Sequence, residues 1–177
     1  MPQHVVVRLA DSLPPGQWAA LTRARRGPLE PAAAEAIEAA LDAHGGACHL
    51  RDAAVATVVV DALRACEPAR YVLHAWVVMP NHVHLLWTPA PGWTLSALLH
   101  GFKSYTAHAA NRLLGRAGAF WAPEYYDRAI RDDPHFQAVR AYIEANPVRA
   151  GLCLTPEAWR FGSAFERAHP TEREGGA

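Results

Sequence analysis

Two histidines separated by a single residue, His82 and His84, form the first pattern in the sequence that could do chemistry. Residues two apart on a β-strand point to the same face, and a rise of ~3.3 Å per residue sets their Cα atoms about 6.5 Å apart. Two imidazoles at that spacing can bind one metal ion, while Val83 between them points into the core. Since the chain has ten histidines, a chance pair without a ligand role is the alternative.

A tyrosine and an asparagine four residues apart, Tyr142 and Asn146, make the second pattern. Positions i and i+4 share one face of a helix, and these two lie beside a predicted apolar stripe of Phe136, Val139 and Ile143. From there both side chains can face a cleft at the edge of the core. The alternative is an ordinary boundary tyrosine with a polar residue near a helix end.

Charge is balanced over the whole chain but not along it. Seventeen Lys and Arg stand against 17 Asp and Glu, which excludes a protein that wraps nucleic acid by bulk charge. Between Pro68 and Pro123 there is no Asp or Glu, but there are five histidines and the basic residues Arg70, Lys103, Arg112 and Arg116. A segment free of carboxylates predicts local contacts with phosphates, and a solvated helix face is the alternative.

Composition limits the class of protein. A chain of 177 residues with 51% hydrophobic and 19% charged residues is typical of one folded domain and excludes wholesale disorder. The cysteines Cys48, Cys66 and Cys153 are odd in number and far apart, which favours a reduced, cytoplasmic setting over a zinc–cysteine site. The N-terminus has no signal-peptide pattern, and no apolar run approaches the ~20 residues of a membrane span, so we expect no membrane association.

The strands that must position these residues can be located from β-branched runs and turn residues. They are predicted at residues 4–9, in a hairpin over residues 71–87 that turns at Met79-Pro80-Asn81, and at residues 125–130.

Helices are predicted from caps and breakers. They begin after Gly16, at Pro31, at Asp52, at Thr94 and at Asp133-Pro134; Gly45-Gly46, Pro68, Gly115 and Pro147 are the predicted stops. This order predicts an α+β protein with a ferredoxin-like (split βαβ) antiparallel sheet, an inserted N-terminal helical segment and a C-terminal catalytic helix. Helices would cover one face and leave the other open for a ligand. Residues 1–167 would form one domain, and residues 168–177 a disordered tail.

Four segments together resemble the REP-associated tyrosine transposases, single-tyrosine members of the HUH superfamily similar to the small single-strand transposases of bacterial insertion sequences. These segments read HAWVVMPNHVHLLWTP, GFKSYTAHAANRLLGRAGAFW, EYYDRAIRDDPHF and YIEANPVRAGL. The resemblance covers roughly residues 4–165 and is weak between Gln17 and Ala69.

The resemblance implies roles for individual residues. His82 and His84 match the histidine pair, Asn146 the third ligand of a divalent metal, Mg²⁺ or Mn²⁺, and Tyr142 the nucleophile. DNA contacts are predicted at Lys103, Arg112, Arg116 and Asn81. The other tyrosines that could compete for the nucleophile's role are Tyr71, Tyr105, Tyr125 and Tyr126.

The implied reaction is transesterification of single-stranded DNA folded as a palindromic, repetitive extragenic hairpin, through a 5′-phosphotyrosine, in the cytoplasm at the nucleoid. Two alternatives stay open. One is a metal-dependent hydrolase, for which Asp127 could supply the carboxylate base; the other is a non-catalytic module that binds single-stranded nucleic acid. The sequence does not distinguish a monomer from a homodimer.

Overall fold

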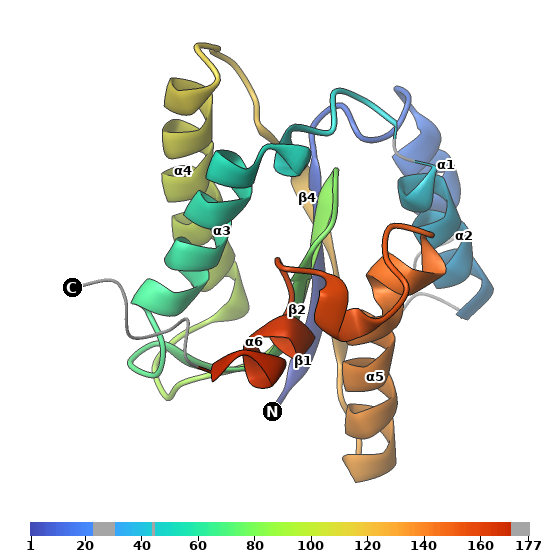
Figure 1. Cartoon of the computed structure of the whole chain (residues 1–177), viewed down its shortest axis with the longest axis vertical. Helices are drawn as coiled ribbons and strands as arrows, with labels where there is room; N and C mark the ends of the chain where they lie inside the picture. Colours follow the sequence, from blue (N-terminus) through green and yellow to red (C-terminus); the bar gives the residue numbers. More distant parts are fainter. Residues whose placement is uncertain (23–30, 44, 171–177) are drawn as a thin grey trace.

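The computed structural model describes residues 1–22, 31–43 and 45–170. A four-stranded antiparallel sheet runs through its centre (Figure 1). Its strands are β1 (Gln3–Leu9), β2 (Tyr71–Val78), β3 (His82–Pro89) and β4 (Trp121–Ala129), in the spatial order β2-β3-β1-β4. The hairpin predicted around Met79-Pro80-Asn81 is therefore confirmed as β2 and β3.

Two helices make crossovers between strands that are not neighbours in the sheet. Helix α3 (Ala53–Ala65) leads into β2, and α4 (Leu95–Leu113) connects β3 to β4. Each crossover passes over one intervening strand, which is the split βαβ arrangement. Both helices pack against each other on one face of the sheet (Figure 1). The predicted α+β class and ferredoxin-like sheet are confirmed.

The predicted caps explain where these two helices begin. The Asp52 side chain accepts a hydrogen bond from the Ala54 N–H, and the Thr94 hydroxyl accepts one from the Ala97 N–H. Each satisfies one of the backbone donors that the first turn of a helix leaves unpaired. After α4, Gly115 takes a positive φ of 61°, a conformation that favours glycine.

Strand alternation builds the main core on the α3 and α4 side. The inward residues of the two central strands are Val5, Val7 and Leu9 on β1 and Val83, Leu85 and Trp87 on β3. Their alternate neighbours on the same strands must point to the opposite face. That second face therefore receives the histidines of β3.

Helices also cover the second face, so the prediction of an open face is wrong. Helix α5 (Asp133–Arg149) packs on β2 and β3, and α2 (Pro31–Asp42) places Ile37 and Leu41 against Val6 and Tyr126. Helix α1 (Gln17–Thr22) lies beside α2. The predicted N-terminal helical segment is thus present, and it makes the molecule three-layered (Figure 1).

Short elements complete the chain. They are the 3₁₀ turns η1 (His49–Arg51) and η2 (Pro156–Ala158) and the helix α6 (Ser163–Ala168), whose Ser163 hydroxyl accepts from the Trp76 N–H of β2 at 3.2 Å. Most of the predicted tail, from residue 171 onward, lies outside the described residues. Within the described part of the chain, no helix combines the length and apolarity needed to cross a membrane.

Three predicted boundaries shift. Strand β4 begins at Trp121, four residues before the predicted start, and α5 is capped by Asp132, whose side chain accepts from the His135 N–H. Pro147 does not end α5, which continues to Arg149. Only the last turn follows this proline, and the Ala150 N–H still donates to the Asn146 carbonyl, so little hydrogen bonding is lost. Asn146 consequently stays helical, one turn after Tyr142.

Because one face of the sheet forms the main core and the other carries the candidate site, substitutions on the core face should act on stability. Leu85 is fully buried on the α3 and α4 side of β3, so Leu85→Ala should lower the free energy of unfolding by about 2–5 kcal/mol. Val72→Ala, at a side chain 45% exposed on the edge strand β2, should change it by less than about 0.5 kcal/mol. Urea titration of both variants measures this, and equal effects would contradict the assigned core.

Candidate active site

Strand β3 brings the two predicted histidines together. His82 and His84 both point to the α5 side of the sheet, and their Nε2 atoms lie 3.1 Å apart. Both side chains are fully buried, contrary to the expectation of a site on an open sheet face. The layer formed by α2 and α5 explains this burial. The pair is therefore enclosed between sheet and helices.

Asn81 orients the first histidine. Its amide nitrogen donates to the carbonyls of Leu41 at 3.1 Å and Gly45 at 3.2 Å, so its oxygen faces His82 Nδ1 at 2.7 Å. That oxygen can only accept, so His82 carries its proton on Nδ1 and presents the Nε2 lone pair toward His84. Asn81 is itself fully buried. This position does not fit the DNA contact that the sequence analysis predicted for it.

A third histidine, His4 on β1, was missed by the sequence analysis. Its Nε2 lies 3.2 Å from His84 Nδ1, and the two rings stack at 5.5 Å between centroids. Burial, with a smaller contribution from His84, lowers the pKa of His4 to about 3, so the ring is neutral. The alternation of Val5 and Val7 into the main core contained the signal, because it directs His4 to the opposite face.

A carboxylate, Glu38 on α2, joins the histidines and was also missed. Its Oε2 lies 3.3 Å from His84 Nε2, and Glu38, His82 and His84 offer ligand atoms that all lie within 4.8 Å of one another. Burial by itself would raise the pKa of Glu38, but the neighbouring histidines, His84 foremost, lower it to about 2. The carboxylate is therefore ionised. Nothing in the α2 sequence indicates which strand this glutamate would reach.

Asn146 on α5 has a buried side-chain amide without a hydrogen-bond partner among the described residues, as expected of a residue that binds a ligand. It is 1% exposed, and neither its amide oxygen nor its amide nitrogen has a hydrogen-bond partner among the described residues. A buried polar group left unpaired costs about 1–3 kcal/mol. The two imidazoles and the Glu38 carboxylate suit a divalent ion, so this group fits the metal that the sequence implied, and the unpaired Asn146 amide is a candidate oxygen donor on the helix that packs on β3.

Tyr142 lies against this cluster. Its ring centroid is 6.0 Å from that of His84 and 6.2 Å from that of His4, and the guanidinium carbon of Arg149 lies 4.6 Å from the same centroid. Burial, and then the Glu38 charge, raise the pKa of Tyr142 well above its usual value, while Arg149 acts in the opposite direction. The phenol is therefore protonated at neutral pH and needs help to become a nucleophile.

The competing tyrosines are placed differently. The Tyr71 hydroxyl donates to the Leu63 carbonyl at 2.6 Å, Tyr105 is exposed on α4, and Tyr125 packs with the main core. Only one of the four, Tyr126, faces the histidines, with its ring 5.9 Å from His4. Among the four, Tyr126 alone shares the neighbourhood of Tyr142.

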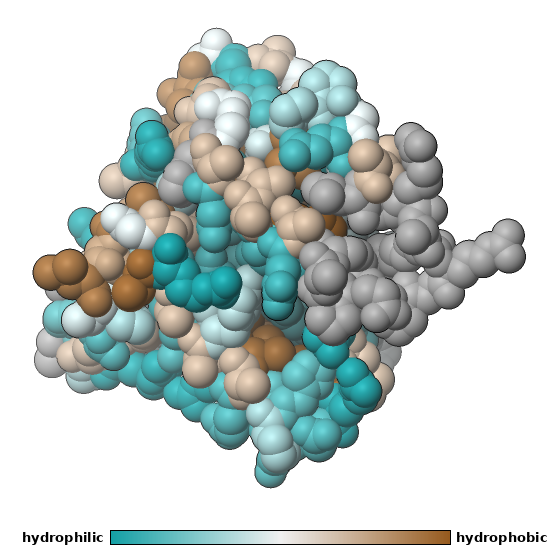
Figure 2. Space-filling model, turned by 90° about the vertical axis from the view of Figure 1, so that its right-hand side faces the viewer, coloured by the Kyte–Doolittle hydropathy of each residue, from teal (hydrophilic) through white to brown (hydrophobic). Residues whose placement is uncertain are grey.

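A cavity of about 500 Å³ opens beside the tyrosine. Its lining includes His4, Glu38, Tyr126, Arg128, Tyr142 and Arg149. Helices α2 and α5 supply Glu38, Tyr142 and Arg149, and the other three residues come from strands β1 and β4. The layer of α2 and α5 is turned to the viewer in Figure 2, where hydrophilic residues predominate over the lower part. A ligand in this cavity would touch Tyr142 without displacing the buried histidines.

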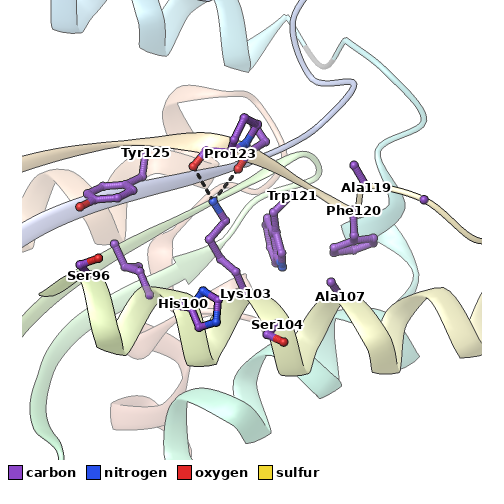
Figure 3. Close-up of a pocket in the computed structure, with 13 residues that line it drawn as sticks. Ser96, His100, Lys103, Ser104, Ala107, Ala119, Phe120, Trp121, Pro123 and Tyr125 are labelled. Carbon is purple, nitrogen blue, oxygen red and sulfur yellow. Dashed lines mark hydrogen bonds between the residues drawn. The ribbon is translucent and has the colours of Figure 1, made fainter.

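The predicted basic contacts on and after α4 do not converge on this cluster. Lys103 lines a separate pocket of about 610 Å³ with His100 and Trp121, and its ammonium donates to the carbonyls of Ala122 at 2.5 Å and Pro123 at 3.0 Å (Figure 3). Burial lowers the pKa of Lys103. Its charge is therefore directed at strand β4.

The two arginines near the end of α4 differ from each other. Arg116 donates to the Asn111 side chain at 3.2 Å and to the Ala119 carbonyl at 3.4 Å, which holds the turn after the helix. Arg112 is exposed on the helix surface. Of the three basic residues predicted to contact DNA, which are Lys103, Arg112 and Arg116, only Arg112 is exposed.

Comparison with known proteins agrees with this arrangement. A REP-associated tyrosine transposase of Escherichia coli (strain K12) is 31% identical over 98 residues, 55% of this chain and 56% of that protein, so the chain spans about half the length of this curated relative. A REP-associated tyrosine transposase solved with a REP hairpin shares the fold, with a TM-score of 0.59 at 20% identity over 96% of this chain and 80% of that chain. The model of the IS200-like transposases matches residues 56–146, just over half of the sequence. The chain therefore belongs to the IS200-like transposase family.

Proposed function

We propose that this chain is a metal-dependent single-stranded DNA endonuclease and strand transferase, with Tyr142 as its nucleophile and hairpin DNA of the REP type as its substrate. The observation that carries the proposal is that the Tyr142 ring lies against His84 and His4 and lines the same cavity as Glu38. The substrate is taken from the relatives, one of which is described as bound to a REP hairpin. Such a substrate would place the protein in the cytoplasm, at the nucleoid.

Four side chains would hold the divalent ion. They are His82 and His84 on β3, Glu38 on α2 and Asn146 on α5. The two oxygen donors favour Mg²⁺ or Mn²⁺ over the softer ions that a histidine pair alone would accept. When bound, the ion polarises a phosphoryl oxygen and stabilises the charge that develops on it.

Tyr142 supplies the attacking atom. Its phenolic oxygen forms a bond to phosphorus while the bond from phosphorus to the 3′ oxygen breaks. The phenol loses one proton and the departing 3′ oxygen gains one, so the products are a 5′-phosphotyrosine and a free 3′-hydroxyl. Because the phosphodiester count is unchanged, another 3′-hydroxyl can reverse the step and join a strand without ATP.

Glu38 orients the phenol in this scheme. Its charge raises the pKa of Tyr142, but a carboxylate whose own pKa is about 2 is a poor proton acceptor for a phenol. We therefore assign it the alignment of the Tyr142 oxygen and a ligand position, and not storage of the proton. Arg149, which lowers the pKa of Tyr142, favours the ionised phenol.

Glu38 also gives one alternative some weight. A metal-dependent hydrolase needs a carboxylate near the histidine pair, and Glu38 is that carboxylate. Such an enzyme would use water in place of Tyr142 and form no covalent adduct. A binding module without catalysis would give neither product nor adduct.

Tyr142→Phe removes only the phenolic oxygen and should abolish both strand cleavage and the covalent adduct, while DNA affinity stays within a few-fold. Denaturing electrophoresis with hairpin DNA labelled at its 3′ end and Mn²⁺ detects the adduct directly. Tyr126→Phe, which alters the neighbouring tyrosine of the same cavity, should keep it. An adduct that persists in the Tyr142 variant would assign the nucleophile elsewhere, and cleavage without any adduct would favour the hydrolase.

Asn146→Ala should lower the Mn²⁺ affinity at least about tenfold without lowering the stability of the metal-free protein, because it removes a buried amide that has no partner among the described residues. Titration calorimetry with Mn²⁺ and thermal unfolding with chelator measure the two effects separately. Gln137→Ala, at an exposed position of α5, serves as the control and should change neither. Unaltered Mn²⁺ affinity in the Asn146 variant would remove it from the ligand set.

Arg112→Ala should weaken DNA binding about equally for different sequences and reduce the slope of log affinity against log salt by about 1, as expected for one lost phosphate contact. Lys103→Ala should instead lower the stability of the fold, because its ammonium binds two carbonyls of β4. Fluorescence anisotropy at several salt concentrations, with urea unfolding in parallel, separates the two effects. A salt slope unchanged by the Arg112 substitution would mean that this side chain is only solvated.

A further inference from the structure

Two arginines line the cavity beside Tyr142 from different elements. Arg149 lies in the last turn of α5 and Arg128 near the end of β4, and both contribute to the lining together with the tyrosine. Neither belongs to the segment that the sequence analysis singled out for phosphate contact. Both are accessible, since Arg149 is exposed and Arg128 is half-buried.

Several other arginines of the chain form ion pairs with carboxylates, whereas these two do not do so among the described residues. Arg8 pairs with Glu124, and Arg140 and Arg167 pair with Glu144. In the part of the chain that the structure describes, neither Arg128 nor Arg149 makes an ion pair with a carboxylate, although Glu35 and Glu38 line the same cavity. Neither guanidinium is therefore held by a carboxylate within the described protein.

Arg149 is directed at the nucleophile. Its guanidinium carbon lies 4.6 Å from the centroid of the Tyr142 ring, and its charge lowers the pKa of the tyrosine hydroxyl. A guanidinium has five N–H donors in a planar fork, so contact with one phenol leaves donors for another acceptor. An anion bound to those donors would lie next to the phenolic oxygen.

We propose that Arg149 binds the DNA phosphate that Tyr142 attacks, and that Arg128, on strand β4, holds the backbone of the same strand of DNA in the cavity. This assignment rests on the proposed function and names two residues through which the site would take a single strand. Guanidinium groups form bidentate, charge-assisted hydrogen bonds with phosphate, and the cavity opens both of them to a strand. A chain with no net charge needs such local clusters to bind a polyanion.

Binding can be tested without cleavage in the Tyr142→Phe background, where the ring that faces Arg149 is kept. The probe is a hairpin with a single-stranded 5′ extension, followed by fluorescence anisotropy at several salt concentrations. Arg149→Ala and Arg128→Ala should each weaken binding at least about tenfold and reduce the salt slope by about 0.7, the value for one contact with a single strand. Arg149→Lys, which keeps the charge but loses the fork, should recover part of the affinity.

The matched control is Arg140→Ala, which removes an arginine from the same helix that pairs with Glu144 and does not line this cavity. Its affinity should stay within about twofold of the background. Circular dichroism and thermal unfolding of every variant verify the fold, and the Lys variant keeps the test valid if Arg149→Ala is unstable.

The outcomes separate this proposal from the proposed function. If affinity and salt slope do not change in the Arg149 and Arg128 variants, the phosphate contacts are overturned, whether or not the wild-type protein forms an adduct. If both variants lose affinity but the wild-type protein forms no adduct, the phosphate contacts stand. The proposed transesterification by Tyr142 is then wrong. With Tyr142 restored, Arg149→Ala should also slow adduct formation at saturating DNA by about 10²-fold or more.

Discussion

The antiparallel pairing of the two central strands, β1 and β3, is the constraint on which both the core and the candidate site depend. Val6 opposes His84 and Arg8 opposes His82 in this register. A slip of one residue would exchange the faces, turning the histidines into the α3 and α4 core and the valines toward α5. The apolar residues on one face hold the register, because a slip of β3 would take Val83 and Leu85 out of the main core and bring His82 and His84 into it. Hydrophobic packing on one side thus fixes the polar geometry on the other.

Burial of the polar cluster is tolerable because most of its polar atoms contact one another. His82 is bonded to Asn81, His84 to His4 and Asn81 to two backbone carbonyls, and Glu38 contacts His84. The exceptions are Glu38 Oε2 and the Asn146 amide, which have no hydrogen-bond partner among the described residues. Fully paired networks are rigid, whereas a partly paired group indicates where a ligand belongs. The unpaired amide therefore fits the metal site that we propose more simply than a structural role.

Local patterns in the sequence were sufficient for much of the fold and for part of the site. Alternation along β3 places His82 and His84 on one face, and helical spacing places Tyr142 and Asn146 one turn apart. In each pair the two residues are separated by only a few positions in the sequence. His4 could have been found by the same alternation on β1. Glu38 could not, because its role depends on how α2 packs across the sheet, which no local pattern encodes. The open face was predicted wrongly for the same reason. Pro147 was wrongly predicted to end its helix, because it lies in the last turn, where few backbone hydrogen bonds remain to be broken.

The location of Glu38 on α2 has a mechanical consequence for the second layer. The Gly45 carbonyl, just beyond α2, accepts a hydrogen bond from Asn81, and Glu38, within α2, contacts His84. These two contacts attach the helix to the sheet. An ion shared by Glu38 and the β3 histidines would act as a third fastening. By linkage, every tenfold gain in metal affinity that Glu38 provides would resist detachment of α2 by about 1.4 kcal/mol at saturation. The helix that closes the site would then be most firmly seated when the metal needed for chemistry is in place.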